Sequence, residues 1–143
     1  FAPIQVDIFL SAICNGWQSK PDVVYVPTDN LPIIHGDQML LYEAIGELLD
    51  NASRFTPPDK SITISASVMA NYLHITIADE GQGIDANTLP FIFEMFWRNE
   101  VATHSGLGLG LPFVRQIAHL HGGDVDVTST VGVGSQFTIR IPV

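Results

Sequence analysis

The chain has 143 residues, of which 46% are hydrophobic and 15% are charged, and its formal net charge at pH 7 is −9. That length and apolar content suit one folded domain, residues 1–143, and exclude a disordered tail. The six basic residues form no stripe that would bind nucleic acid, and no apolar run approaches the roughly 20 residues of a membrane span. The single cysteine excludes an internal disulfide, and the first ten residues lack the features of a signal peptide.

The first half of the chain predicts a helix, a strand and a longer helix, in that order. Apolar residues recur at helical spacing from Val6 to Trp17, and a proline follows shortly afterwards. The β-branched run at 23–26 predicts a short strand. Asp37 is expected to be the N-cap of the longest helix, whose apolar pattern continues to Arg54 before two prolines end it.

The second half predicts two β-hairpins, separated by glycine-rich loops and one more helix. Segments 61–69 and 73–78 alternate apolar and polar residues, and the second hairpin joins 125–127 to 137–141. The intervening helix spans 111–120. Because strands and helices do not alternate regularly, we expect an α/β two-layer sandwich with a mostly antiparallel sheet. The apolar face of the first hairpin is predicted to include Ile62, Ile64, Ala66 and Val68.

The helix from 37 to 54 carries a polar column with the composition of a binding or catalytic site. At about 100° per residue, Glu43, Glu47, Asn51 and Arg54 fall on one narrow face. A carboxylate can accept a proton, an amide oxygen suits Mg²⁺, and a guanidinium can clamp a phosphate. Taken alone, such a column is more often a solvated helix face with i,i+4 pairs. The wider opposite face predicts the core side of the helix: Leu41, Ala44, Ile45, Leu48, Leu49 and Ala52.

Asp79 ends the second strand of the first hairpin and is followed by Gly81 and Gly83. Its carboxylate can accept a hydrogen bond from an exocyclic amine, such as that of adenine. The glycines would let a base approach the main chain closely. A simple Asp-Gly turn explains this segment equally well when the segment is taken alone.

A second glycine cluster, from Gly106 to Leu111, leads directly into a helix. Glycines at this place expose backbone N–H groups at the positive end of the helix dipole, a recurrent way to bind phosphate. The segment is not a P-loop, because both lysines, Lys20 and Lys60, lie elsewhere. The alternative is that the glycines of this cluster serve only to form turns. Before this cluster, the aromatic segment around Phe93 suits the core, and residues 99–105 have the polar character of a mobile lid.

In this order, the segments resemble the motifs of the GHKL ATPase superfamily, and of its histidine-kinase branch in particular. Residues 47–56 resemble the N-box, 79–84 the G1 box, 93–96 the F-box, 106–111 the G2 box and 132–137 the closing glycine motif. The resemblance covers the chain from about Asp7 to Val143. It implies the Bergerat fold, in which a mixed sheet of about five strands packs against about three helices.

The resemblance also implies roles at the matched positions. Glu47 is the candidate base or polarising group for an attacking histidine, and Asn51 ligates Mg²⁺. Asp79 binds the adenine amino group, with Gly83 near the base, while Arg54 and Arg98 contact phosphate. Phe55 lines the adenine pocket, and the second glycine cluster meets the phosphates through its N–H groups. The implied nucleotide-binding set is Asn51, Arg54, Phe55, Asp79, Gly81, Gly83, Ile84, Arg98, Gly106, Leu107, Gly108, Leu109, Gly110, Leu111 and Ser135.

The activity that the resemblance implies uses ATP and Mg²⁺ and moves the γ-phosphoryl group to a histidine. That histidine lies on a separate dimerisation domain, which in turn serves the receiver domain of a response regulator. A domain of this kind is expected in the cytoplasm, even where the parent kinase is anchored in the inner membrane. None of the five histidines has an H-E/D-x-x-x-P context, so we expect the chain alone to bind ATP without phosphorylating itself.

Two departures from the family pattern keep other functions open. Leu107 stands where the family commonly has Thr or Ser, and the lid is short. One alternative is a module that binds ATP or a partner and transfers nothing. Another is a different branch of the superfamily, such as the anti-sigma serine kinases or the chaperone and mismatch-repair ATPases. The F-box, followed after a short lid by G-x-G-L-G-L, favours the histidine-kinase branch.

Overall fold

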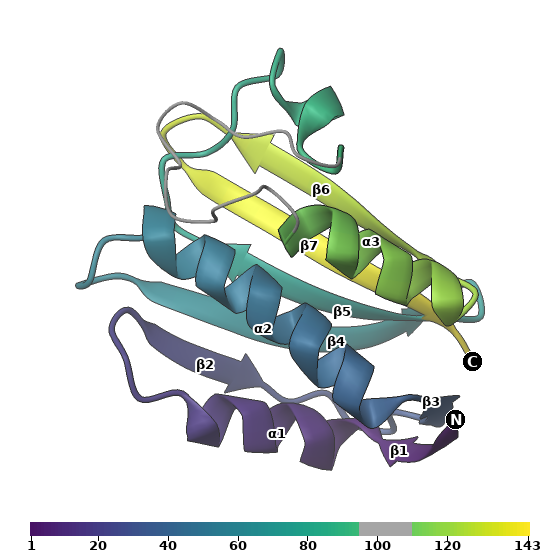
Figure 1. Ribbon diagram of the computed structural model, residues 1–143. Helices are drawn as coiled ribbons and strands as arrows, with labels where there is room; N and C mark the ends of the chain where they lie inside the picture. Colours follow the sequence, from purple (N-terminus) through teal and green to yellow (C-terminus); the bar gives the residue numbers. More distant parts are fainter. Residues whose placement is uncertain (95–109) are drawn as a thin grey trace.

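The computed structural model describes residues 1–94 and 110–143. Within these residues, three α-helices lie on one face of a five-stranded sheet, so the fold has two layers (Figure 1). The predicted two-layer α/β sandwich is therefore confirmed. Arg98, Gly106, Leu107, Gly108 and Leu109, together with the segment 99–105, lie outside the described residues.

The elements occur in the predicted order, with two short strands in addition. In chain order they are β1 (Ala2–Gln5), α1 (Val6–Gly16), β2 (Asp22–Val26), β3 (Ile33–Gly36), α2 (Gln38–Phe55), β4 (Ser61–Met69), β5 (Tyr72–Asp79), the 3-10 turn η1 (Leu89–Phe91), α3 (Gly110–Leu120), β6 (Asp124–Thr130) and β7 (Gly134–Pro142).

The main sheet has the strand order β2-β4-β5-β7-β6. β2 pairs with β4 in parallel, whereas the other three pairs are antiparallel. The sheet is thus mixed and mostly antiparallel, as predicted. β1 and β3 form a separate antiparallel pair, which the sequence analysis did not predict. Each of these strands has four residues, too few to show a clear alternation, and their pairing joins segments about 30 residues apart in the chain.

Helix α2 crosses the centre of the helical layer and is fixed at its N-terminal end. The Asp37 side chain accepts a hydrogen bond from Leu40 N at 3.1 Å, which confirms the predicted N-cap. The Asp37 N–H donates to Nε2 of the buried His121 at 3.0 Å, and His121 Nδ1 lies 2.8 Å from Ile117 O. His121 therefore ties the C-terminal end of α3 to the start of α2, with Nδ1 carrying its proton.

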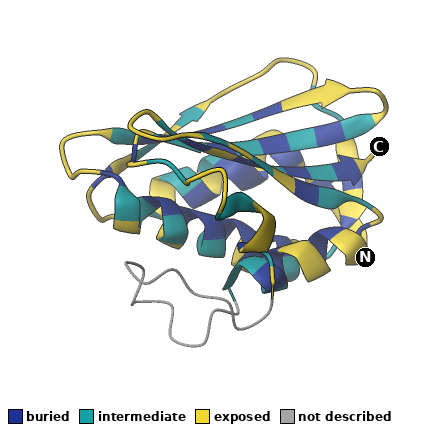
Figure 2. Ribbon diagram, turned by 90° about the horizontal axis from the view of Figure 1, so that it is seen from above, coloured by how far each residue is buried: buried dark blue, intermediate teal, exposed yellow. Residues whose placement is uncertain are grey.

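The core lies between the helices and the facing side of the sheet (Figure 2). All six apolar residues predicted for the inner face of α2 are buried. Alternate residues of β4, β5 and β7 point to the same core. Val68 is an exception, because it is 47% exposed near the end of the β4–β5 hairpin. The buried strand residues are Ile62, Ile64, Ala66, Leu73, Ile75, Ile77, Phe137, Ile139 and Ile141.

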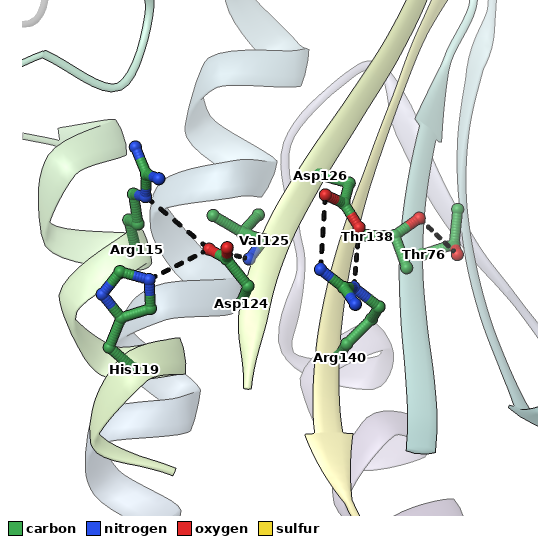
Figure 3. Close-up of polar contacts among 8 residues, drawn as sticks. All are labelled: Thr76, Arg115, His119, Asp124, Val125, Asp126, Thr138 and Arg140. Atoms are coloured by element: carbon green, nitrogen blue, oxygen red, sulfur yellow. Dashed lines mark hydrogen bonds and ion pairs between the residues drawn. The ribbon is translucent and has the colours of Figure 1, made fainter. Parts of the chain in front are cut away.

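The opposite face of the sheet is polar, and its edge carries ion pairs (Figure 3). The hydroxyls of Thr76 and Thr138 lie 3.0 Å apart across β5 and β7. Arg140 Nε lies 2.7 Å from a carboxylate oxygen of Asp126 on β6. These contacts lie on the side of the sheet away from the helices. Because Asp126 is exposed, its ion pair with Arg140 contributes little to the stability of the fold.

Asp124, at the start of β6, connects the sheet to α3 instead (Figure 3). Its Oδ1 lies 3.1 Å from His119 Nε2 and 3.6 Å from Arg115 Nε. Burial alone would raise the pKa of Asp124. A backbone N–H and the charges of His119 and Arg115 together hold that pKa below its usual value. Of the helices in residues 1–94 and 110–143, none is long and apolar enough to cross a membrane.

Candidate functional site

The described residues form a cleft between the C-terminal half of α2, the end of β5 and the loop that follows β5. This cleft brings together seven of the predicted site residues, from α2, β5, the loop, α3 and β7: Asn51, Phe55, Asp79, Gly83, Ile84, Leu111 and Ser135. Segments that lie more than eighty residues apart in the chain therefore meet at one place.

Asp79 is one of two carboxylates that line the cleft, with Asp85, and its hydrogen bonds to the described part of the chain all go to one oxygen. Its Oδ1 accepts the N–H of Gly81 at 2.9 Å and the N–H of Ser135 at 3.1 Å. No donor from residues 1–94 or 110–143 is hydrogen-bonded to Oδ2. Burial raises the pKa of Asp79, although the two backbone hydrogen bonds act in the opposite direction. The carboxylate is thus oriented by the protein and incompletely solvated, a state in which it gains from a ligand that donates a hydrogen bond.

The two glycines after Asp79 are required by the packing of the loop. A Cβ on Gly81 would lie 2.7 Å from the carbonyl oxygen of Phe55, at the end of α2. Gly83 has a φ of +79°, and a Cβ there would collide with the backbone of Thr130 and Val131. The loop is therefore pressed between α2 and the β6–β7 hairpin. A direct contact between Gly83 and a base stays a prediction.

Helix α2 supplies the amide and the acid of the polar column. Asn51 lines the cleft, and Arg54 one turn later is exposed. Glu47 is half-buried beside the start of α3, where a Cβ on Gly110 would lie 2.6 Å from Glu47 Oε2. Burial raises the pKa of Glu47, and the charge of Asp50 adds to this effect. The carboxylate of Glu47 is therefore a stronger proton acceptor than an ordinary exposed glutamate.

Of the aromatic residues predicted for the core, the structure describes Phe93, which is partly buried and packs against the core. Phe93 packs edge-on against the buried Phe137, with 6.1 Å between the ring centroids. Ile92 is buried and lines the cleft. Phe96 and Trp97 lie outside the described part of the chain.

Sequence reasoning missed four residues that line the cleft: Gln82, Asp85, Thr88 and Ile92. Gln82 lies inside the G1-like segment, and the other three lie on the loop and turn that follow it, where no periodic pattern indicates which side chains face inward. It also missed Ser129, which contacts the loop from β6. Ser129 lies opposite Ser135 because the pairing of β6 with β7 is centred on Gly132, one residue before the centre of the predicted turn at 132–134. Counting back from that turn would therefore not have found Ser129.

The donor set of the cleft is compatible with Mg²⁺ bound together with phosphates. Among residues 1–94 and 110–143, no group of three or more His, Cys, Asp or Glu residues is placed to hold a metal ion alone. Mg²⁺ characteristically uses one or two protein oxygens and completes its shell with phosphate oxygens and water. Asn51 offers one such oxygen within the cleft.

The fold and the cleft define a class of protein: an α/β-sandwich domain whose cleft holds the oriented carboxylate of Asp79 and the amide of Asn51, near the start of α3. The family of histidine kinase-, DNA gyrase B- and HSP90-like ATPases matches residues 36–143, which is most of the chain. The chain belongs to this family, as an ATPase domain of the histidine-kinase type.

Individual relatives agree with this assignment. The adaptive-response sensory kinase SasA of Synechococcus elongatus is 34% identical over 147 residues, covering 100% of this chain and 38% of SasA. The solved structure of the mycobacterial sensor histidine kinase MprB has a TM-score of 0.77 and 26% identity, covering 96% of this chain and 92% of that one. Full-length ShkA in complex with AMPPNP has a TM-score of 0.84 and 24% identity, covering 99% of this chain and 30% of that one. The chain thus spans less than half of SasA.

Proposed function

We propose that the cleft binds Mg-ATP and that the domain transfers the γ-phosphoryl group to a histidine on a separate dimerisation domain. The family assignment provides the ATPase class. The particular nucleotide pose, the metal and the acceptor are inferred from the residues of the cleft.

The orientation of Asp79 is the observation that carries the proposal. Two backbone N–H groups fix Oδ1, so Oδ2 is available to accept a hydrogen bond. Adenine presents an amine donor at the corresponding edge, whereas guanine presents a carbonyl acceptor that would repel the carboxylate. Phe55, Ile84 and Leu111 add apolar surface to the cleft for a flat base. The ShkA complex with AMPPNP shows an adenine nucleotide analogue bound to a protein of the same fold.

The polar column of α2 would then face the phosphates. Asn51 is the residue that would hold Mg²⁺, and the metal would neutralise phosphate charge when bound. Glu47 would accept or polarise the imidazole proton of the acceptor histidine while the other ring nitrogen attacks the γ-phosphorus. The bond from that phosphorus to the β,γ-bridging oxygen breaks, and ADP leaves. The raised pKa of Glu47 suits this task, because a more basic carboxylate polarises the imidazole more strongly. We also assign Arg54, with Arg98 and the segment 106–110, to the phosphates.

The partners and the location follow from the same proposal. The acceptor is the histidine-bearing dimerisation domain of a parent kinase, and a response regulator receiver domain would take the phosphoryl group from it. These steps place the domain in the cytoplasm, where ATP and receiver domains are found. The net charge of −9 gives no support for binding to nucleic acid or to an anionic membrane surface.

The test is incubation of the chain with γ-labelled ATP and a separate histidine-bearing helical hairpin. We expect an acid-labile label on the hairpin, formed only with Mg²⁺ and at least tenfold more slowly with Asn51→Ala. Mg²⁺-dependent binding of ATP without any label on the hairpin would instead identify a binding module. Labelling that persists unchanged in Asn51→Ala would contradict the proposed role of Asn51.

A further inference from the structure

Three polar residues stand in a row across the sheet beside the cleft. Asp79 on β5 is aligned with Ser135 on β7, and Ser135 is aligned with Ser129 on β6. Residues directly opposite each other on neighbouring strands point to the same face of a sheet. Phe137, two residues after Ser135, is buried against the helices, so the row faces the helical layer. Of the three, only Ser129 has no part in the motifs that predicted the site.

The Ser129 hydroxyl is used three times. It accepts the backbone N–H of Ile84 at 2.7 Å and donates to the carbonyl of Gly134 at 3.1 Å. It also lies 2.8 Å from the hydroxyl of Ser135. A serine hydroxyl has one proton to donate and two lone pairs that accept. Because Ser129 donates its proton to the Gly134 carbonyl, it accepts hydrogen bonds from both Ile84 N and the Ser135 hydroxyl. Its hydrogen-bonding capacity is filled by the protein, which excludes a free role in ligand binding.

These contacts fix the loop that forms one wall of the cleft. Gly83 and Ile84 both line the cleft, and Ile84 is held through its N–H by Ser129. A second bond, from Gly132 N to Gln82 O at 2.8 Å, also ties the loop to the β6–β7 hairpin. Of these two ties, only the bond to Ser129 depends on a side chain, so it alone can be removed by substitution without altering the backbone.

We propose that Ser129 is a positioning residue for nucleotide recognition, holding the 82–84 loop and Ser135 in the arrangement that directs Asp79 toward the purine amine. The inference rests on the proposed function of the cleft. Ser129 would touch no atom of the nucleotide. Without its hydroxyl, the N–H of Ile84 would lose its acceptor and the loop would move relative to Asp79, so that both affinity and the preference for adenine would fall.

The experiment compares Ser129→Thr with Ser129→Val, two side chains of the same shape that differ in the hydroxyl. Titration calorimetry with Mg²⁺ measures the Kd of AMPPNP and of the corresponding guanosine analogue for each. We expect Ser129→Thr to stay within about threefold of the parent chain, and Ser129→Val to raise the Kd of AMPPNP about tenfold, equivalent to about 1.4 kcal/mol. The ratio of the Kd of the guanosine analogue to the Kd of AMPPNP measures the preference for adenine. In Ser129→Val this ratio should also fall about tenfold.

Thr128→Val is the matched control, since it removes a hydroxyl from the exposed neighbouring residue, which faces the other side of the sheet. It should leave both constants unchanged. A hydroxyl with a structural role only would lower the Tm of Ser129→Val but leave the affinities of the folded protein and their ratio alone. Ser129→Ala provides a second variant without the hydroxyl if Ser129→Val does not fold.

The outcomes separate this inference from the proposed function. If the parent chain fails to bind Mg-AMPPNP, the proposed function itself is wrong. If the parent chain binds with a preference for adenine, and Ser129→Val and Ser129→Thr have equal affinity and equal preference, then the role of Ser129 is refuted while the proposed function stands.

Discussion

The polar groups near the two ends of α2 differ in how much of their hydrogen-bonding capacity the protein itself satisfies. At the start of α2, both ring nitrogens of the buried His121 are hydrogen-bonded within the protein, to Asp37 N and Ile117 O. At the other end, the hydrogen bonds between Asp79 and the part of the chain that the structure describes all go to one carboxylate oxygen. The pKa values of Glu47 and Asp79 are both raised by burial. A polar side chain alone therefore does not indicate a binding site. The hydrogen bonds of His121 are complete and stabilise the fold, whereas the Asp79 carboxylate can still accept a hydrogen bond from a ligand.

The largest expected effect is on phosphoryl transfer. Glu47→Gln keeps the size and hydrogen-bonding reach of the side chain but removes its basicity, so the transfer rate should fall by about 10²–10⁴. The measurement is the initial rate of labelling of a histidine-bearing hairpin domain by γ-labelled ATP. Glu43→Gln, one turn earlier on the same face, is the control and should change the rate no more than about twofold. A Glu47→Gln rate within tenfold of the parent chain would remove this residue from the catalytic step.

The next effect concerns affinity. In Asp79→Asn, the amide oxygen can still accept the N–H groups of Gly81 and Ser135, which turns the amide nitrogen toward the ligand. Two donors would then face each other at the adenine amine, so the Kd of AMPPNP should rise about 100-fold. The guanosine analogue should lose far less, because the amide can donate to its carbonyl. Calorimetry with both nucleotides gives the comparison, and an unchanged Kd for AMPPNP would show that the adenine assignment is wrong.

At the start of α2, where the hydrogen bonds of His121 are complete, the expected effect is on the free energy of unfolding and not on the preference for adenine. His121→Leu leaves the N–H of Asp37 without an acceptor and cuts the link between α3 and α2, which should lower the free energy of unfolding by about 2 kcal/mol. Urea unfolding monitored by circular dichroism measures this. His119→Leu is the matched control on the same helix. His119 is exposed and makes only a surface ion pair, so its loss should cost less than about 1 kcal/mol. Equal losses of unfolding free energy in the two variants would mean that the buried hydrogen bonds of His121 contribute no more to stability than the surface ion pair of His119.

The smallest effect is a pH dependence of stability in the absence of ligand. Because burial raises the pKa of Asp79 above its unfolded value of 3.8, the folded protein binds that proton more tightly than the unfolded chain does. Stability contributed by this residue should therefore rise as the pH falls from neutral toward 4. Relative to Asp79→Asn, the parent chain should gain stability over this range. Urea unfolding of both proteins at pH 7 and pH 4.5 tests the sign, and a relative loss at pH 4.5 would contradict it.

Much of the fold could be predicted because the signals are local. The six buried residues of α2 follow from helical spacing, and Asp37 follows from the chemistry of helix N-caps. The pairing of β1 with β3 has no local signal, since it joins short segments far apart in the chain. Val68 continues the alternation of β4 but is exposed near the end of the β4–β5 hairpin, so its pattern predicts a burial that the packing does not supply.

The residues of the candidate site likewise include some that the sequence indicates and one that it does not. Glycine-rich motifs indicate Asp79 and Ser135 because their residue types recur with fixed spacing, and the structure brings both to the cleft. Ser129 is a common residue on an edge strand, and only the register of β6 against β7 gives it a role. Three-dimensional register, rather than residue type, is thus the information that the sequence analysis lacked.

The most direct test of the account is a crystal structure of the chain grown with Mg²⁺ and AMPPNP. We expect the analogue in the cleft of α2 and β5, with the adenine amine within hydrogen-bonding distance of the Asp79 carboxylate and Mg²⁺ coordinated by Asn51. A nucleotide bound at another place, or a base whose amine does not meet Asp79, would contradict the central claim.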